Sequence, residues 1–172
     1  MSRLDSHIQQ KIAQRDAIDL AARWLGARQD WIVELGLGNA RSYSHLVERF
    51  PGREIFCFDR SNRAHPRSRP PADRFIEGEF EAVLADAALH RRFAGRVMLL
   101  HIDVGSGGPQ DEVLPELLAG QTHGWLLPGA VVLSDQDLTL APDWRLARVD
   151  TRGDVQHAER YYVYRRSGEP GA

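Results

Sequence analysis

The sequence predicts a single α/β domain built on a doubly wound, mostly parallel sheet. Short apolar runs alternate with segments whose apolar residues recur every three or four positions, as buried strands alternate with helices. Several runs close on an acidic residue, at the strand end where open α/β sheets bind ligands. A chain of 172 residues, 42% hydrophobic and 27% charged, is long enough for one such core.

The apolar runs place five strands, with helices between them, before a C-terminal hairpin. The helix after the third strand is expected to bury Phe80, Val83, Leu84, Ala87 and Phe93. The helix after the fourth strand bears Val113, Leu114, Leu117 and Leu118, and it is expected to start late or kink because of Pro115. Prolines exclude a long helix from residues 60–74, and residues 167–172 are expected to be disordered. The strands are expected at residues 31–35, 54–59, 74–77, 96–104 and 130–135, with an antiparallel pair at 144–150 and 160–166.

An amphipathic helix is expected over residues 6–25, with Ser6 as its cap and Gly26 as its end. Residues 1–27 are therefore interpreted as a helix attached to the main domain, residues 28–166. Three roles are open for this helix. The helix could cover the mouth of a ligand site, pair with a second copy in a homodimer, or pack on the edge of the sheet.

The stretch from 31 to 42, Trp-Ile-Val-Glu-Leu-Gly-Leu-Gly-Asn-Ala-Arg-Ser, reads as a buried strand, a tight turn and the start of a helix. Glycine adopts positive φ at little cost and lets a ligand approach the backbone, and a helix N-terminus favours a carboxylate or a phosphate. A dinucleotide fingerprint needs a small residue where this chain has Arg41. Glu34, before the turn, would repel a pyrophosphate but accept a hydrogen bond from an ammonium group.

A second acidic residue follows the glycine turn at the spacing expected of a ribose-binding carboxylate. Asp59 ends the next strand and lies 23 residues after Gly36, near the spacing at which a carboxylate reaches ribose hydroxyls. The helix between them is expected to bury Tyr43, Leu46, Val47 and Phe50 and to stop at Pro51-Gly52.

The pattern Glu34-x-Gly36-x-Gly38, followed by Asp59, resembles that of class I S-adenosylmethionine-dependent methyltransferases. The resemblance covers residues 28–166 and implies a Rossmann-like sheet of about seven strands with an antiparallel edge hairpin. It also implies S-adenosyl-L-methionine as cofactor and a small-molecule methyl acceptor, a hydroxyl oxygen being one candidate. His101 and Asp103 are the catalytic candidates. The cofactor residues implied are Glu34, Gly36, Gly38, Asn39, Ser42, Tyr43, Asp59, Arg60, Glu79, Phe80 and Asp103.

Asp103 and the run Asp135-Gln136-Asp137 end neighbouring strands. Oxygen ligands grouped there suit Mg²⁺ or another divalent cation, and the arrangement resembles that of cation-dependent O-methyltransferases. Gln136 departs from their pattern, and acids at strand ends also cap loops. The predicted metal ligands are Asp103, Asp135 and Gln136.

Residues 60–74 are rich in arginine and proline and predict an exposed loop. Besides being simply solvated, such a loop could clamp an anionic substrate, or Arg60 could receive the 2′-phosphate of NADP. Two other functions therefore stay open: an NAD(P)-binding reductase or nucleotide-sensing module, and a non-catalytic homologue that only binds the cofactor.

Composition and charge indicate which binding partners and which cellular compartment to expect for the protein. A net charge of −2 gives no overall field for nucleic acid or membrane. The single cysteine, Cys57, lies in an apolar run and is expected to be a buried strand residue. The polar N-terminus and the lack of a long apolar stretch predict a cytoplasmic protein.

Overall fold

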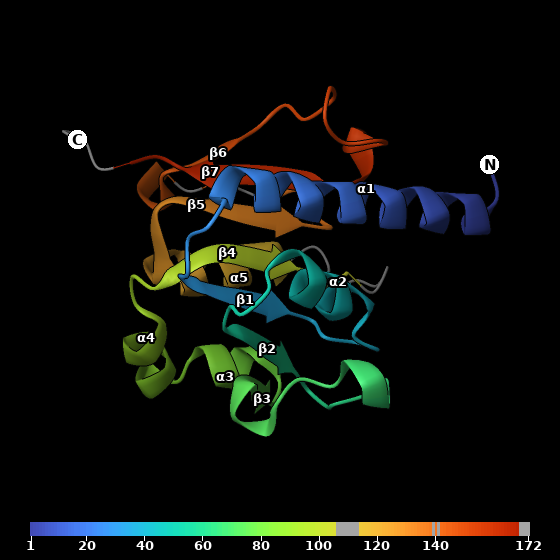
Figure 1. The fold of residues 1–172 in the computed structure, drawn as a ribbon. Coiled ribbons are helices and arrows are strands. Elements are labelled where there is room, and N and C mark those ends of the chain that lie inside the picture. Colours follow the sequence, from blue (N-terminus) through green and yellow to red (C-terminus); the bar gives the residue numbers. More distant parts are fainter. Residues whose placement is uncertain (106–113, 139, 141, 169–172) are drawn as a thin grey trace.

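The computed structural model describes residues 1–105, 114–138, 140 and 142–168, and these form a sheet of seven strands in the order β3-β2-β1-β4-β5-β7-β6 (Figure 1). The first five strands are parallel, and β7 runs antiparallel to both β5 and β6. The predicted mostly parallel sheet with a C-terminal antiparallel hairpin is confirmed. The strands are β1 (Trp31–Leu35), β2 (Ile55–Asp59), β3 (Phe75–Glu77), β4 (Val97–Ile102), β5 (Leu126–Ser134), β6 (Leu146–Arg148) and β7 (Tyr162–Arg166).

Two groups of helices accompany the sheet. α1 packs against α2, and both lie in front of the strands in Figure 1, whereas α3 contacts α4 and α5. β1 and β4, at the centre, are almost entirely buried, as strands covered on both faces must be. The α-helices are α1 (Arg3–Leu25), α2 (Arg41–Arg49), α3 (Phe80–Leu84), α4 (Ala87–Phe93) and α5 (Leu114–Thr122), and the 3₁₀ turns are Pro66–Ser68, Ala72–Arg74, His123–Trp125, Pro142–Trp144 and Ala158–Arg160.

α1 begins earlier than predicted, because Ser2 rather than Ser6 caps it. The Ser2 hydroxyl accepts from the backbone N–H of Asp5 at 3.0 Å, and the Asp5 carboxylate accepts from the backbone N–H of Ser2 at 3.1 Å. This reciprocal capping box satisfies two donors at the helix start. The predicted end is confirmed, since the helix stops at Leu25 and Gly26 follows with φ of +52°.

The single helix expected between Phe80 and Phe93 is two short helices. The Asp86 carboxylate accepts from the backbone N–H of Ala88 at 2.7 Å and so starts α4 anew. Leu84 and Phe93 are buried as expected, but Ala87 is exposed because it lies in the first turn after the break.

β5 starts at Leu126, four residues before the predicted start, so Pro128 and Gly129 lie inside the strand rather than before it. Gly129 has φ of +77°, and the pairing with β4 shifts register here. A local irregularity of this kind accommodates proline and glycine within a strand.

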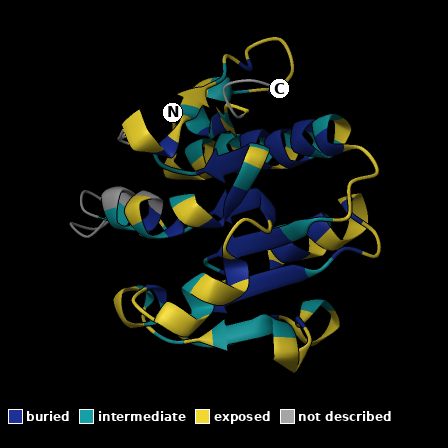
Figure 2. Cartoon of the chain, turned by 90° about the vertical axis from the view of Figure 1, so that its left-hand side faces the viewer, coloured by how far each residue is buried: buried dark blue, intermediate teal, exposed yellow. Residues whose placement is uncertain are grey.

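The core lies between the sheet and its helices (Figure 2). Cys57 is buried as predicted, and burial beside Glu34 raises the pKa of its thiol far above the usual value. On α2, Tyr43, Leu46 and Phe50 are buried, but Val47 is 45% exposed because it lies on the outer side of the helix.

The remaining expectations are met where the structure describes them. Residues 60–74 contain only two short 3₁₀ turns, and α5 starts at Leu114 so that Pro115 falls in its first turn. Val113, and residues 169–172 of the expected tail, lie outside the described residues. Within the described ranges, no helix combines the length and apolarity needed to cross a bilayer.

Candidate active site

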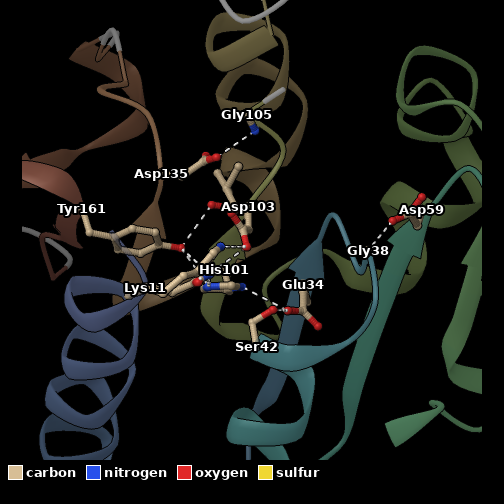
Figure 3. A network of polar contacts seen from close by, with 12 residues as sticks. Lys11, Glu34, Gly38, Ser42, Asp59, His101, Asp103, Gly105, Asp135 and Tyr161 are labelled. Atoms are coloured by element: carbon tan, nitrogen blue, oxygen red, sulfur yellow. Dashed lines mark hydrogen bonds and ion pairs between the residues drawn. The ribbon is translucent and has the colours of Figure 1, made fainter. Parts of the chain in front are cut away.

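The glycine turn after β1 is pressed against the end of β4. Gly36 has φ of +91°, and a Cβ atom there would lie 2.3 Å from the backbone oxygen of Asp103. Only glycine fits such an approach. Gly38 donates its backbone N–H to Asp59 Oδ2 at 2.8 Å (Figure 3), so the carboxylate that ends β2 also fixes the turn.

The turn borders a cavity of about 230 Å³, which we call the cofactor cavity. It lies at the carboxyl ends of β1 and β4, where open α/β sheets bind ligands. Five of the predicted cofactor residues line it, namely Gly36, Gly38, Asn39, Ser42 and Asp103. The other lining residues are Leu37, Arg41 and, from α1, His7, Lys11 and Gln14.

The other predicted cofactor residues lie outside this lining. Tyr43 is buried in α2, and Arg60 is exposed after β2. Glu79 is the exposed N-cap of α3, and Phe80 is its half-buried first residue. Their turn adjoins Asp59, because the Gly78 N–H donates to the Asp59 backbone oxygen at 3.0 Å.

Glu34 lies beneath the cavity and is completely buried. Its Oε1 accepts from the Ser42 hydroxyl at 2.6 Å, and its Oε2 accepts weakly from the Cys57 thiol at 3.6 Å. His101 Nδ1 lies 3.3 Å from the same Oε1, at ion-pair distance but without the alignment of a hydrogen bond. The carboxylate thus orients Ser42, which does line the cavity.

A chain of polar contacts continues from His101 toward α1. His101 Nε2 lies 2.8 Å from the Tyr161 hydroxyl and 3.2 Å from Gln14 Nε2. Both rings are fully buried. Burial, reinforced by Asp103 and Asp135, raises the pKa of Tyr161 well above its usual value, so its hydroxyl stays neutral.

Asp103 is the carboxylate of this network that reaches the cavity. Its Oδ2 accepts from Gln14 Nε2 at 2.8 Å and from Lys11 Nζ at 3.1 Å. Burial alone would raise the pKa of Asp103, but Lys11, His101 and the two hydrogen bonds outweigh burial and lower it. Asp103 is therefore a stable anion next to a cation from α1.

Asp135 directly follows β5 and lies close to Asp103. Its Oδ2 accepts from the Gly105 N–H at 2.7 Å. Burial and the charge of Asp103 raise its pKa to about 6. It can therefore exchange a proton near neutral pH.

The metal ligands Asp103, Asp135 and Gln136 stay a prediction. In the described part of the chain, no three His, Cys, Asp or Glu side chains are grouped so as to hold a metal ion. The ammonium of Lys11 lies on Asp103, where a cation would bind, and Asp135 is directed to Gly105. Both polar atoms of the half-buried Gln136 side chain are buried and have no hydrogen-bond partner among the described residues.

The sequence interpretation missed the residues that α1 and the C-terminal region contribute, chiefly Lys11, Gln14 and Tyr161. Two signals were present. Lys11 is the single lysine of the sequence, and Gln14 interrupts the face that α1 buries with Ala13, Ala17 and Ile18. A polar residue on a buried helical face indicates a partner across the interface.

The sequence matches the model of a family described as S-adenosyl-L-methionine methyltransferase over residues 1–166. The chain belongs to this methyltransferase family. The expected resemblance is thereby confirmed, and the protein is an S-adenosylmethionine-dependent methyltransferase enzyme by family and fold.

Solved structures agree with this assignment. An S-adenosyl-L-methionine methyl transferase from Silicibacter pomeroyi DSS-3 is 29% identical, with a TM-score of 0.85 over 96% of this methyltransferase and 99% of that chain. A TehB-like SAM-dependent methyltransferase from Corynebacterium glutamicum shares the fold at 13% identity and a TM-score of 0.55, covering 89% and 88% of the two chains. The comparison with curated proteins gave no match.

Proposed function

We propose that this methyltransferase holds the amino-acid arm of S-adenosylmethionine in the cofactor cavity and transfers the methyl group to a small-molecule acceptor. The observation that carries this proposal is the pairing of charges in the cavity. Asp103 offers an anion to the ammonium group of the cofactor, while Lys11 and Arg41 offer cations to its carboxylate. Fixed opposite charges suit a zwitterionic arm.

The nucleoside would extend from this cavity toward β2 and β3. In this proposal the Asp59 carboxylate accepts from the ribose hydroxyls, and its position at the end of β2 supports this role. The turn carrying Glu79 and Phe80, bonded to Asp59 through Gly78, is then placed to contact the adenine. Arg60 follows Asp59 directly and borders the same edge.

α1 acts in this proposal as a lid that completes the site. It contributes His7, Lys11 and Gln14 to the cofactor cavity. A second cavity of about 500 Å³ lies between α1 and α2 and shares five lining residues with the first, namely His7, Lys11, Gln14, Arg41 and Ser42. Residues 1–27 would therefore exclude water from the donor as well as position it.

Methyl transfer from a sulfonium is an in-line displacement, so positioning does most of the work and an oxygen acceptor must also lose a proton. We assign the role of proton acceptor to Asp135, which lies close enough to Asp103 to be affected by its charge and has a pKa raised to about 6. Asp103 would hold the donor. His101, fully buried behind Asp103, would position Gln14 and Tyr161 rather than contact the acceptor.

A turnover assay tests the proposal. Formation of S-adenosylhomocysteine from S-adenosylmethionine is measured across a panel of small hydroxylated, carboxylated and phosphorylated acceptors. We expect turnover with at least one acceptor class and its loss in the Asp103→Ala variant. Turnover that persists unchanged in this variant would refute the assigned site.

A further inference from the structure

A separate cavity opens on the other side of the glycine turn. It measures about 590 Å³ and lies between the start of α2 and the loop that follows β2. We call it the Arg41–His65 cavity. Every residue lining it is described, and none is acidic. They are Asn39, Ala40, Arg41, Ser44, Arg63, His65 and Ser68.

No residue that the structure describes forms an ion pair with the two arginines lining this cavity. Arg41 and Arg63 are exposed, and neither forms an ion pair with any residue that the structure describes. The adjoining segment 60–72 contains four arginines and one histidine but no aspartate or glutamate, although the whole chain has a net charge of −2. A concentrated, uncompensated positive charge in a hollow favours an anionic ligand.

The other groups that line the cavity supply hydrogen-bond donors. His65 Nδ1 accepts from the backbone N–H of Arg67 at 3.3 Å, so the ring proton of neutral His65 lies on Nε2, which can donate. Ser44 and Ser68 add hydroxyls. The loop is tied to the glycine turn, because the His65 N–H donates to the Asn39 backbone oxygen at 3.4 Å.

We propose that the Arg41–His65 cavity binds a phosphate group. A phosphate presents several acceptor oxygens in different directions, which suits two guanidinium groups, an imidazole and two hydroxyls arriving from two segments. A carboxylate has only two oxygens in one plane and would leave some of these donors unused.

Because of where the cavity lies, we infer that the phosphate it binds belongs to the methyl acceptor. This inference rests on the proposed function. Asn39 and Arg41 line both this cavity and the cofactor cavity. A phosphorylated small molecule anchored here would therefore lie beside the methyl donor. The acceptor class that follows is a phosphomonoester of a small metabolite.

Titration of the full chain with inorganic phosphate, followed by ³¹P NMR line broadening at low ionic strength, tests the site directly. Glycerol phosphate then tests the phosphomonoester. We expect saturable binding of both, weakened at least tenfold in Arg63→Gln. The matched control is Arg67→Gln, which removes the same charge from the same loop but outside the cavity lining, and it should bind phosphate within about twofold of the parent.

Three results would overturn the proposal. One is no saturable phosphate binding, and another is equal weakening in both arginine variants, which would mean general attraction by the loop. The third is binding of a single-stranded RNA oligomer that outcompetes glycerol phosphate and weakens equally in both variants. Calorimetry with S-adenosylhomocysteine on the same samples keeps the proposals separate, since absent cofactor binding would count against the proposed function and absent phosphate binding against this site.

Discussion

Lys11 Nζ lies 3.1 Å from Asp103 Oδ2, and 92 residues separate the two in the sequence. Lys11 belongs to α1, and Asp103 follows β4. Gln14, one turn further along α1, donates to the same oxygen at 2.8 Å. The contact makes the N-terminal helix part of the cofactor cavity (Figure 3).

Replacing Lys11 by methionine is expected to affect cofactor binding more than folding. The pair is partly exposed, so its loss should change the free energy of unfolding by less than ~1 kcal/mol. Affinity for S-adenosylhomocysteine should fall by the ~1.5–3 kcal/mol that a hydrogen bond to a charged group contributes. Calorimetry and urea unfolding measure both. Arg23→Met, on the same helix but paired with the exposed Asp154, is the control and should leave binding unchanged.

Asp59→Ala should weaken S-adenosylhomocysteine binding by about 1–3 kcal/mol, since it removes both the proposed ribose partner and the acceptor for the Gly38 N–H. Asp73→Ala, an exposed acid after the same strand, serves as the control. If both variants bind with the parent dissociation constant, Asp59 does not contact the nucleoside.

Glu34 is predicted to support the fold rather than touch the cofactor. Glu34→Ala leaves the Ser42 hydroxyl without its buried partner and removes the carboxylate beside His101 Nδ1. The lost hydrogen bond alone should cost about 1–3 kcal/mol of stability. Glu34→Gln keeps an oxygen for Ser42 and should be milder. Urea unfolding measures the loss. Weaker S-adenosylhomocysteine binding by Glu34→Gln with unchanged stability would show direct contact instead.

Asp135 gives a prediction about pH. Its folded pKa of about 6 exceeds its ordinary value of 3.8, so between these values the folded state holds more protons than the unfolded state. Its contribution to stability is therefore greatest below pH 4 and declines as the pH rises through 6, by up to about 3 kcal/mol.

Unfolding by urea at several pH values, compared with Asp135→Asn, isolates this effect from the titration of histidines. The variant should be the more stable protein at pH 7, with the difference shrinking toward pH 4. Asp103 has the opposite pH dependence. Because its pKa is lowered, the stability that its carboxylate provides is lost only as the solution becomes more acidic. Parallel stability curves for the two proteins would contradict the assigned environment of Asp135.

The strands and the glycine turn were predictable because their signals are local. Apolar runs and turn glycines are determined by neighbouring residues, so the sheet and the positions of Gly36, Gly38 and Asp59 follow from the sequence. The start of α1 and the break at Asp86 depend on single capping contacts, which several nearby residues could have made.

The network around Asp103 was not predictable in this way. It joins Lys11 and Gln14 on α1 to His101 and to Tyr161 near the C-terminus. Helical periodicity identifies which face of α1 is buried but not which strand it covers. The same limit applies to Glu34, since its spacing to the glycines fits a ligand contact, while only the packed sheet shows that its carboxylate is fully buried.

Calorimetric titration of the full chain with S-adenosylhomocysteine, and separately with NADPH, decides whether the protein binds S-adenosylmethionine or a pyridine nucleotide. We expect one saturable site for S-adenosylhomocysteine and no heat of binding for NADPH. Saturable binding of NADPH together with no binding of S-adenosylhomocysteine would contradict it.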